Sequence, residues 1–137
     1  MILVDDRLAL EVLGGRRFGG ADDGPVATTW TFHYRLVRAL ADDARVGQLT
    51  QSANAVVLRR MAGSPPPELL VVLDPRSLTS TAATVAVRHG LNLLAAELLA
   101  AALVHGAPVV LSAGNVGRRW PEAFLAEGAE LRVEGDP

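Results

Sequence analysis

The sequence predicts an α/β fold, a three-layer α/β/α sandwich with a short, mostly parallel central sheet. Short apolar runs alternate with amphipathic stretches, a pattern typical of helices packed on a parallel sheet. Apolar runs also end in polar residues at Asp5, Asp74 and Ser112, as buried strands do at the functional edge of such sheets. The chain has 137 residues, enough for one core, so we expect a single domain over 1–137.

The first strand and helix are predicted from the opening fifteen residues. "MILVD" is a short buried strand, and "RLALEVLGG" is a helix ended by Gly14 and Gly15. Residues 16–27 combine glycines with paired aspartates and show no apolar period, so we expect a loop there.

The next element is a long helix, "WTFHYRLVRALADD", which Thr28 or Thr29 can cap. Apolar spacing favours an inner face formed by Trp30, His33, Tyr34 and Val37, widened by Leu36 and Leu40.

The middle of the chain predicts a strand, a helix, a strand and a further helix. Their segments are "RVGQLT", "QSANAVVLRRMAG" closed by Gly63, "ELLVVLDP", and "LTSTAATVAVRHG" ended by Gly90. A cap at Thr79 or Ser80 would begin the last of these helices.

The last third contains two more helix–strand pairs. Residues 91–104 form an apolar helix, and 107–112 a buried strand. "RRWPEAFLAEG" places Pro121 near a helix start and Gly128 just past its end, and "AELRVE" is the closing strand. Helix 91–104 is rich enough in Leu and Ala to bury one face on the sheet and another against a second chain.

Composition narrows the function classes. The chain has no cysteine, which excludes disulfides and cysteine zinc sites, and its net charge of −2 gives no general attraction to nucleic acid. All 13 basic residues are arginine. No secretion signal is visible and no apolar run reaches the ~20 residues of a membrane span, so we expect a soluble, cytoplasmic protein without a membrane partner.

Several segments together resemble a PIN domain, particularly the VapC-type toxins. They are the opening "ILVD", the helix ending "VVLRR", the stretch "RHGLNLLAAELLAAALVHGAPVVLSAGNV" and the closing strand. The resemblance implies a Mg- or Mn-dependent ribonuclease whose carboxylates gather at the strand ends, and it implies a homodimer, an antitoxin-like protein partner and possible RNA binding.

The acidic residues of that centre carry over poorly. Asp5 matches the first aspartate of the family, whereas Ala53, Ala95 and Gly114 stand at or beside the places of the other three, with Asn115 as the one partial substitute. We therefore expect a degenerate centre in which Asp5 is the residual catalytic residue and Asp5 and Asn115 are the remaining metal candidates. No cofactor is expected, or Mg or Mn if the site is active.

Glu97 and Asp6 are considered as replacements. Glu97 lies two residues from Ala95, which turns its side chain by about 200° on a helix. We therefore expect Glu97 on the outer helix face, exposed or at an interface. Asp6 is expected to cap the following helix, while Asp5 is either a metal ligand or a cap.

The sequence also allows two alternative functions and an RNA-binding surface. An active ribonuclease would draw its missing ligands from a partner or from Asp42, Asp43 or Asp74. A receiver-like switch would use Asp5 and Asp6 for Mg, Asp74 for phosphate and Ser112 as sensor, but the long Asp6 to Asp74 interval and the lack of lysine oppose it. Possible RNA contacts are the arginine pairs Arg59, Arg60, Arg118 and Arg119.

Overall fold

The computed structural model describes residues 1–19, 23–42 and 55–135. Within these ranges the strands form one parallel sheet of five strands in the order β3-β2-β1-β4-β5. The strands are β1 (Ile2–Val4), β2 (Val26–Thr28), β3 (Val71–Val72), β4 (Val109–Ser112) and β5 (Leu131–Glu134).

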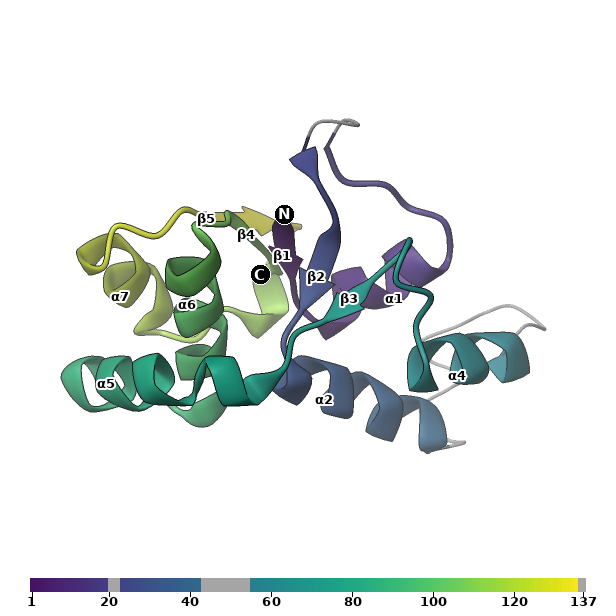
Figure 1. The fold of residues 1–137 in the computed structure, drawn as a ribbon, viewed down its shortest axis with the longest axis horizontal. Helices are drawn as coiled ribbons and strands as arrows, with labels where there is room; N and C mark the ends of the chain where they lie inside the picture. Colours follow the sequence, from purple (N-terminus) through teal and green to yellow (C-terminus); the bar gives the residue numbers. More distant parts are fainter. Residues whose placement is uncertain (20–22, 43–54, 136–137) are drawn as a thin grey trace.

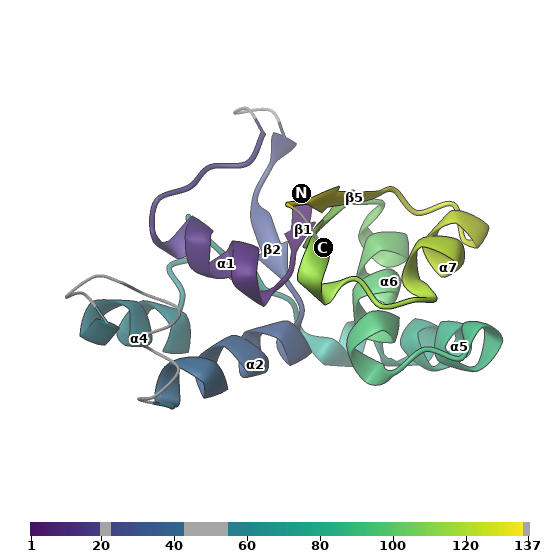
Figure 2. The same ribbon diagram turned by 180° about the vertical axis from the view of Figure 1, so that it is seen from behind.

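Helices cover both faces of this sheet. They are α1 (Asp6–Leu13), α2 (Trp30–Ala41), α4 (Ala55–Gly63), α5 (Thr79–His89), α6 (Leu93–His105) and α7 (Trp120–Ala126), with short 3-10 turns η2 (Pro75–Ser77) and η3 (Ala113–Asn115). Figure 1 shows α1, α2 and α4 on one side of the strands and α5, α6 and α7 on the other, and the reverse view in Figure 2 agrees. The predicted three-layer α/β/α fold is confirmed.

The strand β1 supplies the centre of both core layers. Its residues alternate between faces, as a pleated strand requires. Leu3 packs in the cluster with α5, α6 and α7, while Ile2 and Val4 pack in the cluster with α1, α2 and α4. Because all three side chains are buried, the strand is too apolar to show a period of two in the sequence.

The winding of the chain reverses between β1 and β4. From β1 the chain moves outward through β2 to β3, then crosses to β4 and moves outward the other way to β5. The carboxyl ends of β1 and β4 therefore form the topological switch point, where ligands bind in open α/β sheets. Asp5 follows β1 and Ser112 ends β4, so both lie at this point.

Residues 26 and 27 were expected to lie in a loop, with Thr28 as one of two candidate helix caps, and this was wrong for all three residues. They form β2, which pairs with β1 through Ile2 and Val26 and with β3 through Ala27 and Val71. A strand of three residues is too short to show a period, and its pairing with two neighbours decides its structure. The strand expected over 45–50 lies outside the described residues.

The inner face of α2 agrees with the prediction at Leu36 and Leu40 and differs from it at Trp30 and Tyr34. Phe32, Leu36 and Leu40 are buried, whereas Trp30 is 47% and Tyr34 is 52% exposed and their rings stack on each other. Phe32, Leu36 and Leu40 lie on one face of the helix, and Trp30, Tyr34 and Val37 lie on another. Both sets follow the helical period, so the period alone does not show which set is buried. The cap prediction for this helix is confirmed at Thr29, which accepts a hydrogen bond from the Phe32 N–H.

The start of α5 corrects a further prediction. Its N-cap is Leu78, which makes no side-chain hydrogen bond, and Thr79 Oγ1 donates to the Pro75 carbonyl instead. The chain enters α5 from η2, whose own cap is Asp74, so no separate cap is needed. The predicted stop at Gly90 is confirmed by its left-handed backbone (φ 64°).

Helix α6 is buried by its own chain. Every residue from Ala95 to Ala102 is buried. The sequence allowed either the sheet or a second chain to cover the faces of this helix. Helix α5 packs across it and supplies that cover. Among the described residues no single helix is long and apolar enough to cross a membrane; α5 and α6 would suffice as a pair, but they are bent by 119°.

Candidate functional site

Asp5 is the centre of the site and also the cap of α1. Its backbone is extended, and its Oδ1 accepts a hydrogen bond of 2.8 Å from the Leu8 N–H. The prediction that Asp6 caps this helix is wrong, because β1 ends at Val4 and leaves Asp5 in the cap position. Asp6 is instead the first residue of α1.

The carboxylate of Asp5 is fully buried and saturated with donors. Besides Leu8, it accepts hydrogen bonds from the Ser112 N–H (2.7 Å), the Ser112 hydroxyl (3.3 Å) and the Asn115 side-chain amide (2.9 Å). Each carboxylate oxygen thus receives two donors, which fills the four acceptor positions of the group. These bonds tie the carboxyl end of β1 to the carboxyl end of β4.

Asn115 and Arg35 extend this cluster to Asp6. The Asn115 amide nitrogen donates to Asp6 Oδ1 at 2.9 Å as well as to Asp5. Arg35, on α2, lies 3.3 Å from Asp6 Oδ2 through its Nε and donates from Nη2 to Asn115 Oδ1 at 3.2 Å. The sequence offered no signal for Arg35 at this site, because its contacts span about 30 and 80 residues.

Burial raises the pKa of the Asp6 carboxyl above its usual value of 3.8. The charge of Asp5 acts in the same direction, while Arg35, Asn115 and the Arg7 backbone N–H act in the opposite one. The Arg35 side chain is about half exposed, so water screens its charge, and burial of Asp6 has the larger effect.

The donor set of this cluster does not fit a divalent cation. Mg²⁺ needs oxygen ligands with free lone pairs, and those of Asp5 are occupied. Asn115 turns its N–H₂ group, rather than its oxygen, toward both carboxylates, and Arg35 supplies positive charge at Asp6. In the part of the chain that the structure describes, no group of three or more His, Cys, Asp or Glu side chains is placed to hold a metal ion.

The three positions where the resemblance places further acidic residues, Ala53, Ala95 and Gly114, add no carboxylate to this cluster. Ala95 is fully buried in the first turn of α6, and Gly114 lies in η3 with open space around its Cα. Ala53 falls outside the described residues. The candidate site therefore consists of Asp5, Asp6, Ser112, Asn115 and Arg35.

Glu97 was expected on an exposed or interface face, and this was wrong. Its side chain is only 5% exposed, and Oε1 accepts hydrogen bonds from the Thr31 N–H (2.9 Å) and the Thr31 hydroxyl (2.6 Å). Helix α2 begins beside α6, so an acid on that side of α6 meets the unpaired backbone N–H groups of a helix start. Glu97 thus anchors α2, a role that depends on a contact between distant segments.

Asp74 and Asp42 do not complete the cluster. Asp74 is exposed and pairs with Arg76 in η2, and β2 separates its strand from β1. The neighbouring Arg76 holds the pKa of the Asp74 carboxyl below its usual range. Asp42 stands at the far end of α2, and Asp43 is outside the described residues. A receiver-like site, with its phosphate-accepting acid beside the Mg-binding pair, is not formed.

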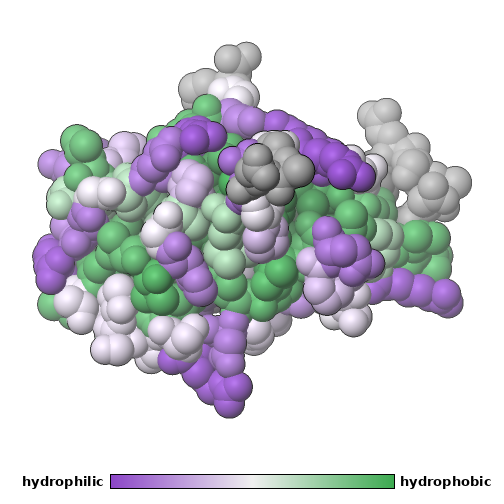
Figure 3. Space-filling model, turned by 45° about the horizontal axis from the view of Figure 1, so that its top comes forward, coloured by the Kyte–Doolittle hydropathy of each residue, from purple (hydrophilic) through white to green (hydrophobic). Residues whose placement is uncertain are grey.

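The arginine pairs expected to contact RNA lie on opposite sides of the sheet. Arg59 and Arg60 belong to α4, whereas Arg118 and Arg119 precede α7 (Figures 1 and 2). Arg59 donates its Nε to the Leu40 carbonyl at the end of α2, so it also stabilises that helix terminus. Figure 3 shows hydrophilic and hydrophobic residues interspersed on one face of the molecule. RNA binding by these arginines stays a prediction.

The described part of the chain is thus a three-layer α/β protein with an acidic pair at the switch point of its sheet. By sequence alone it matches no protein family and no curated protein. By structure it is similar to FitAB bound to an IR36 DNA fragment, with a TM-score of 0.52 and 14% identity over 100% of this chain and 99% of that one. It is also similar to FitAcB from Neisseria gonorrhoeae, with a TM-score of 0.50 and 16% identity over 96% of both chains.

Proposed function

We propose that this chain is a PIN-like protein, related to the toxins of toxin–antitoxin pairs, whose metal-dependent ribonuclease centre is degraded and which acts by binding a protein partner. The observation that carries the proposal is the saturated Asp5 carboxylate, since a group that accepts four hydrogen bonds from its own chain is no ligand for an incoming cation. Similarity to the FitAB structures supports the toxin-related fold and a partner of the antitoxin kind.

The cluster has a structural role that explains why Asp5 is retained without a metal. Asp5 caps α1, fixes the end of β4 through Ser112 and positions Asn115. Arg35 supplies the positive charge that two neighbouring carboxylates require. Electrostatic stabilisation by a catalytic metal contributes several kcal/mol, and each 1.36 kcal/mol is about tenfold in rate, so losing the metal site removes many decades of cleavage.

A cleavage assay tests the proposal. Purified protein with Mn²⁺ and a structured RNA is expected to cleave no faster than the Asp5→Asn variant, which keeps one oxygen at the cap. Urea unfolding of both proteins checks that the variant is folded. Cleavage by the wild type that Asp5→Asn abolishes would overturn the degraded centre.

The second candidate is an active Mg- or Mn-dependent ribonuclease whose ligands are completed elsewhere. It is favoured by the position of Asp5 and Asp6 at the switch point of the sheet. It predicts that the same assay shows metal-dependent cleavage, and that Asp43→Asn, or removal of a partner subunit, reduces it. Sedimentation equilibrium tests the homodimer that the resemblance implies.

A further inference from the structure

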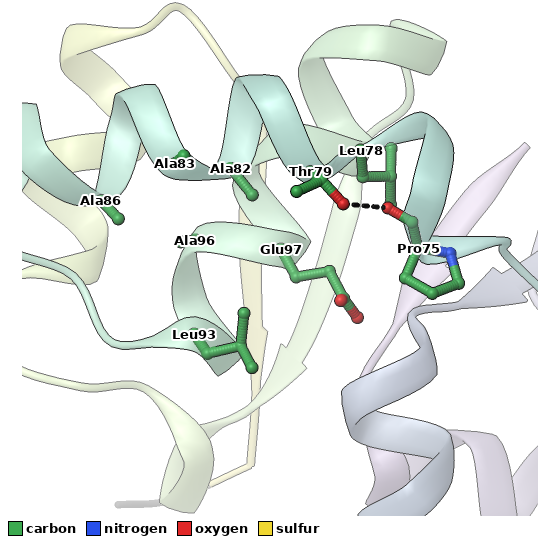
Figure 4. A pocket seen from close by; sticks show the side chains of 9 residues that line it. All are labelled: Pro75, Leu78, Thr79, Ala82, Ala83, Ala86, Leu93, Ala96 and Glu97. Atoms are coloured by element: carbon green, nitrogen blue, oxygen red, sulfur yellow. Dashed lines mark hydrogen bonds between the residues drawn. The ribbon is translucent and has the colours of Figure 1, made fainter.

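A groove between α5 and α6 lies outside the acidic cluster. Its volume is about 300 Å³, and its walls are Ala82, Ala83 and Ala86 of α5 with Leu93 and Ala96 of α6. Figure 4 shows the carboxylate of Glu97 pointing into the open space at the end near Pro75. The groove is thus an apolar channel between two helices with one acid at its end.

One oxygen of Glu97 remains available to a ligand. Oε1 is occupied by the two groups of Thr31, whereas Oε2 has no hydrogen-bond partner in the described part of the chain. No side-chain oxygen or nitrogen in that part is both sealed from solvent and unpaired, so Oε2 keeps some contact with solvent, and Glu97 is one of the residues that line the groove. The two hydrogen bonds to Oε1 hold the carboxylate in place at the end of the groove.

The chemistry of the groove selects a basic side chain with an apolar stem. An arginine can donate to a carboxylate while its methylene groups pack against apolar walls. The alanines on both helices leave room for further apolar side chains to approach closely.

We infer that the α5–α6 groove is a docking site for a polypeptide segment that places an arginine against Glu97 and apolar side chains along the alanines. The inference rests on the proposed partner binding and names its surface. Its basis is charge complementarity, because a buried acid at the end of an apolar groove stabilises a cationic group there far more than a neutral one.

NMR titration tests the groove with a defined probe. A capped peptide containing arginine-leucine-alanine-leucine is added to the ¹⁵N-labelled protein. Its citrulline counterpart, which keeps the shape but not the charge, is the matched ligand. The amides of Ala83, Ala96 and Thr31 are expected to shift, and the citrulline peptide is expected to bind about tenfold more weakly, the scale of one lost charge-assisted hydrogen bond.

Variants of the protein distinguish binding in the groove from binding at other surfaces. Glu97→Gln keeps the side-chain shape and is expected to bind both peptides alike. Ala83→Leu, at an exposed groove position, fills the channel and should abolish binding, whereas Thr84→Leu, the next residue on α5 and outside the groove, should not.

Equal affinity for the two peptides, shifts centred on Asp6 and Asn115, or no shift at all would overturn the groove assignment. None of these results bears on the degraded centre, which the RNA cleavage assay tests separately.

Discussion

A single carboxylate, that of Asp5, joins three segments that are distant in the sequence. It is the helix cap of α1, the acceptor for the end of β4 and the acceptor for Asn115. A metal ligand would keep its oxygens directed at a cation, whereas this one directs them at neutral donors of its own chain. Its removal should therefore reduce stability strongly.

Asp5→Ala is expected to lower the free energy of unfolding by about 3 kcal/mol, because a lost helix cap costs about 1 kcal/mol and buried donors left unpaired cost about 1–3 kcal/mol. Urea unfolding followed by circular dichroism measures the change. Asp74→Ala is the control, since this exposed aspartate caps only a short turn and its removal should cost much less stability than the removal of Asp5. Equal losses in the two variants would contradict the structural role of Asp5.

Asp6 should give the stability a distinctive dependence on pH. Because burial raises the pKa of the folded Asp6 carboxyl above 3.8, the folded protein holds this proton more tightly than the unfolded chain. The contribution of Asp6 is complete below pH 3.8 and decreases as the pH rises from that value to the folded pKa. Asp6→Asn removes this titration.

The stability of Asp6→Asn relative to the wild type is therefore expected to increase with pH across that window. Urea unfolding of both proteins from acid to neutral pH measures the difference, and carboxyl ¹³C NMR follows the titration directly. A difference that decreases with pH would show that the Arg35 contact dominates over burial, and a constant difference would show that the two effects cancel.

At the scale of the helix, the glycine after α6 and the glycine that ends α4 differ in backbone conformation. Gly106 follows α6 with φ 59°, a conformation that favours glycine, and a Cβ there would meet open space. Gly63 is the last residue of α4, has no positive φ and is also in open space. The two positions isolate backbone conformation from steric contact.

Gly106→Ala is expected to destabilise the protein by about 1–2 kcal/mol, the cost of a side chain in the left-handed region. Gly63→Ala should instead stabilise it by about 0.5 kcal/mol, because it restricts only the unfolded chain. Thermal or urea unfolding of the two variants provides the comparison. A loss of stability in both would mean that contacts, not backbone conformation, determine the result.

The sequence predicted the elements with strong local signals and missed those set by tertiary contact. The glycine stop at Gly90, the cap at Thr29 and the strongly apolar strands could be predicted from neighbouring residues. The strand β2 and the buried position of Glu97 could not, because partners distant in sequence create them. For α2 the sequence held two apolar stripes, and the packing of Phe32 rather than Trp30 chose between them.

For the molecule as a whole, the saturated cluster predicts indifference to divalent ions. A ligand at about a hundredfold excess over its Kd stabilises the folded state by about 2.7 kcal/mol. Mn²⁺ at about 1 mM should change the free energy of unfolding by less than about 0.5 kcal/mol. Urea unfolding with Mn²⁺ or with EDTA measures this. Stabilisation by Mn²⁺ that disappears in Asp5→Asn would reveal a metal site.

The candidate site could be predicted only in part for a related reason. Asp5 and Asn115 follow apolar strands, and the rule that sites lie beyond strand ends identified them. Arg35, and also Thr31, which holds Glu97, lie on α2, and no local sequence pattern specifies where this helix lies over the sheet. Predicting them required knowing that the start of α2 lies beside α6 and that its next turn reaches the acidic pair.

Gly114 and Ala95, two positions where the resemblance places an acidic residue, differ in the space available for a larger side chain. At Gly114 a new side chain would enter vacant space, so one codon change could add a carboxylate there without moving any neighbour. Ala95 is enclosed on all sides, and an aspartate there would force the surrounding layer to rearrange. A further acid near the end of β4 would thus meet little steric resistance at Gly114 and a strong one at Ala95.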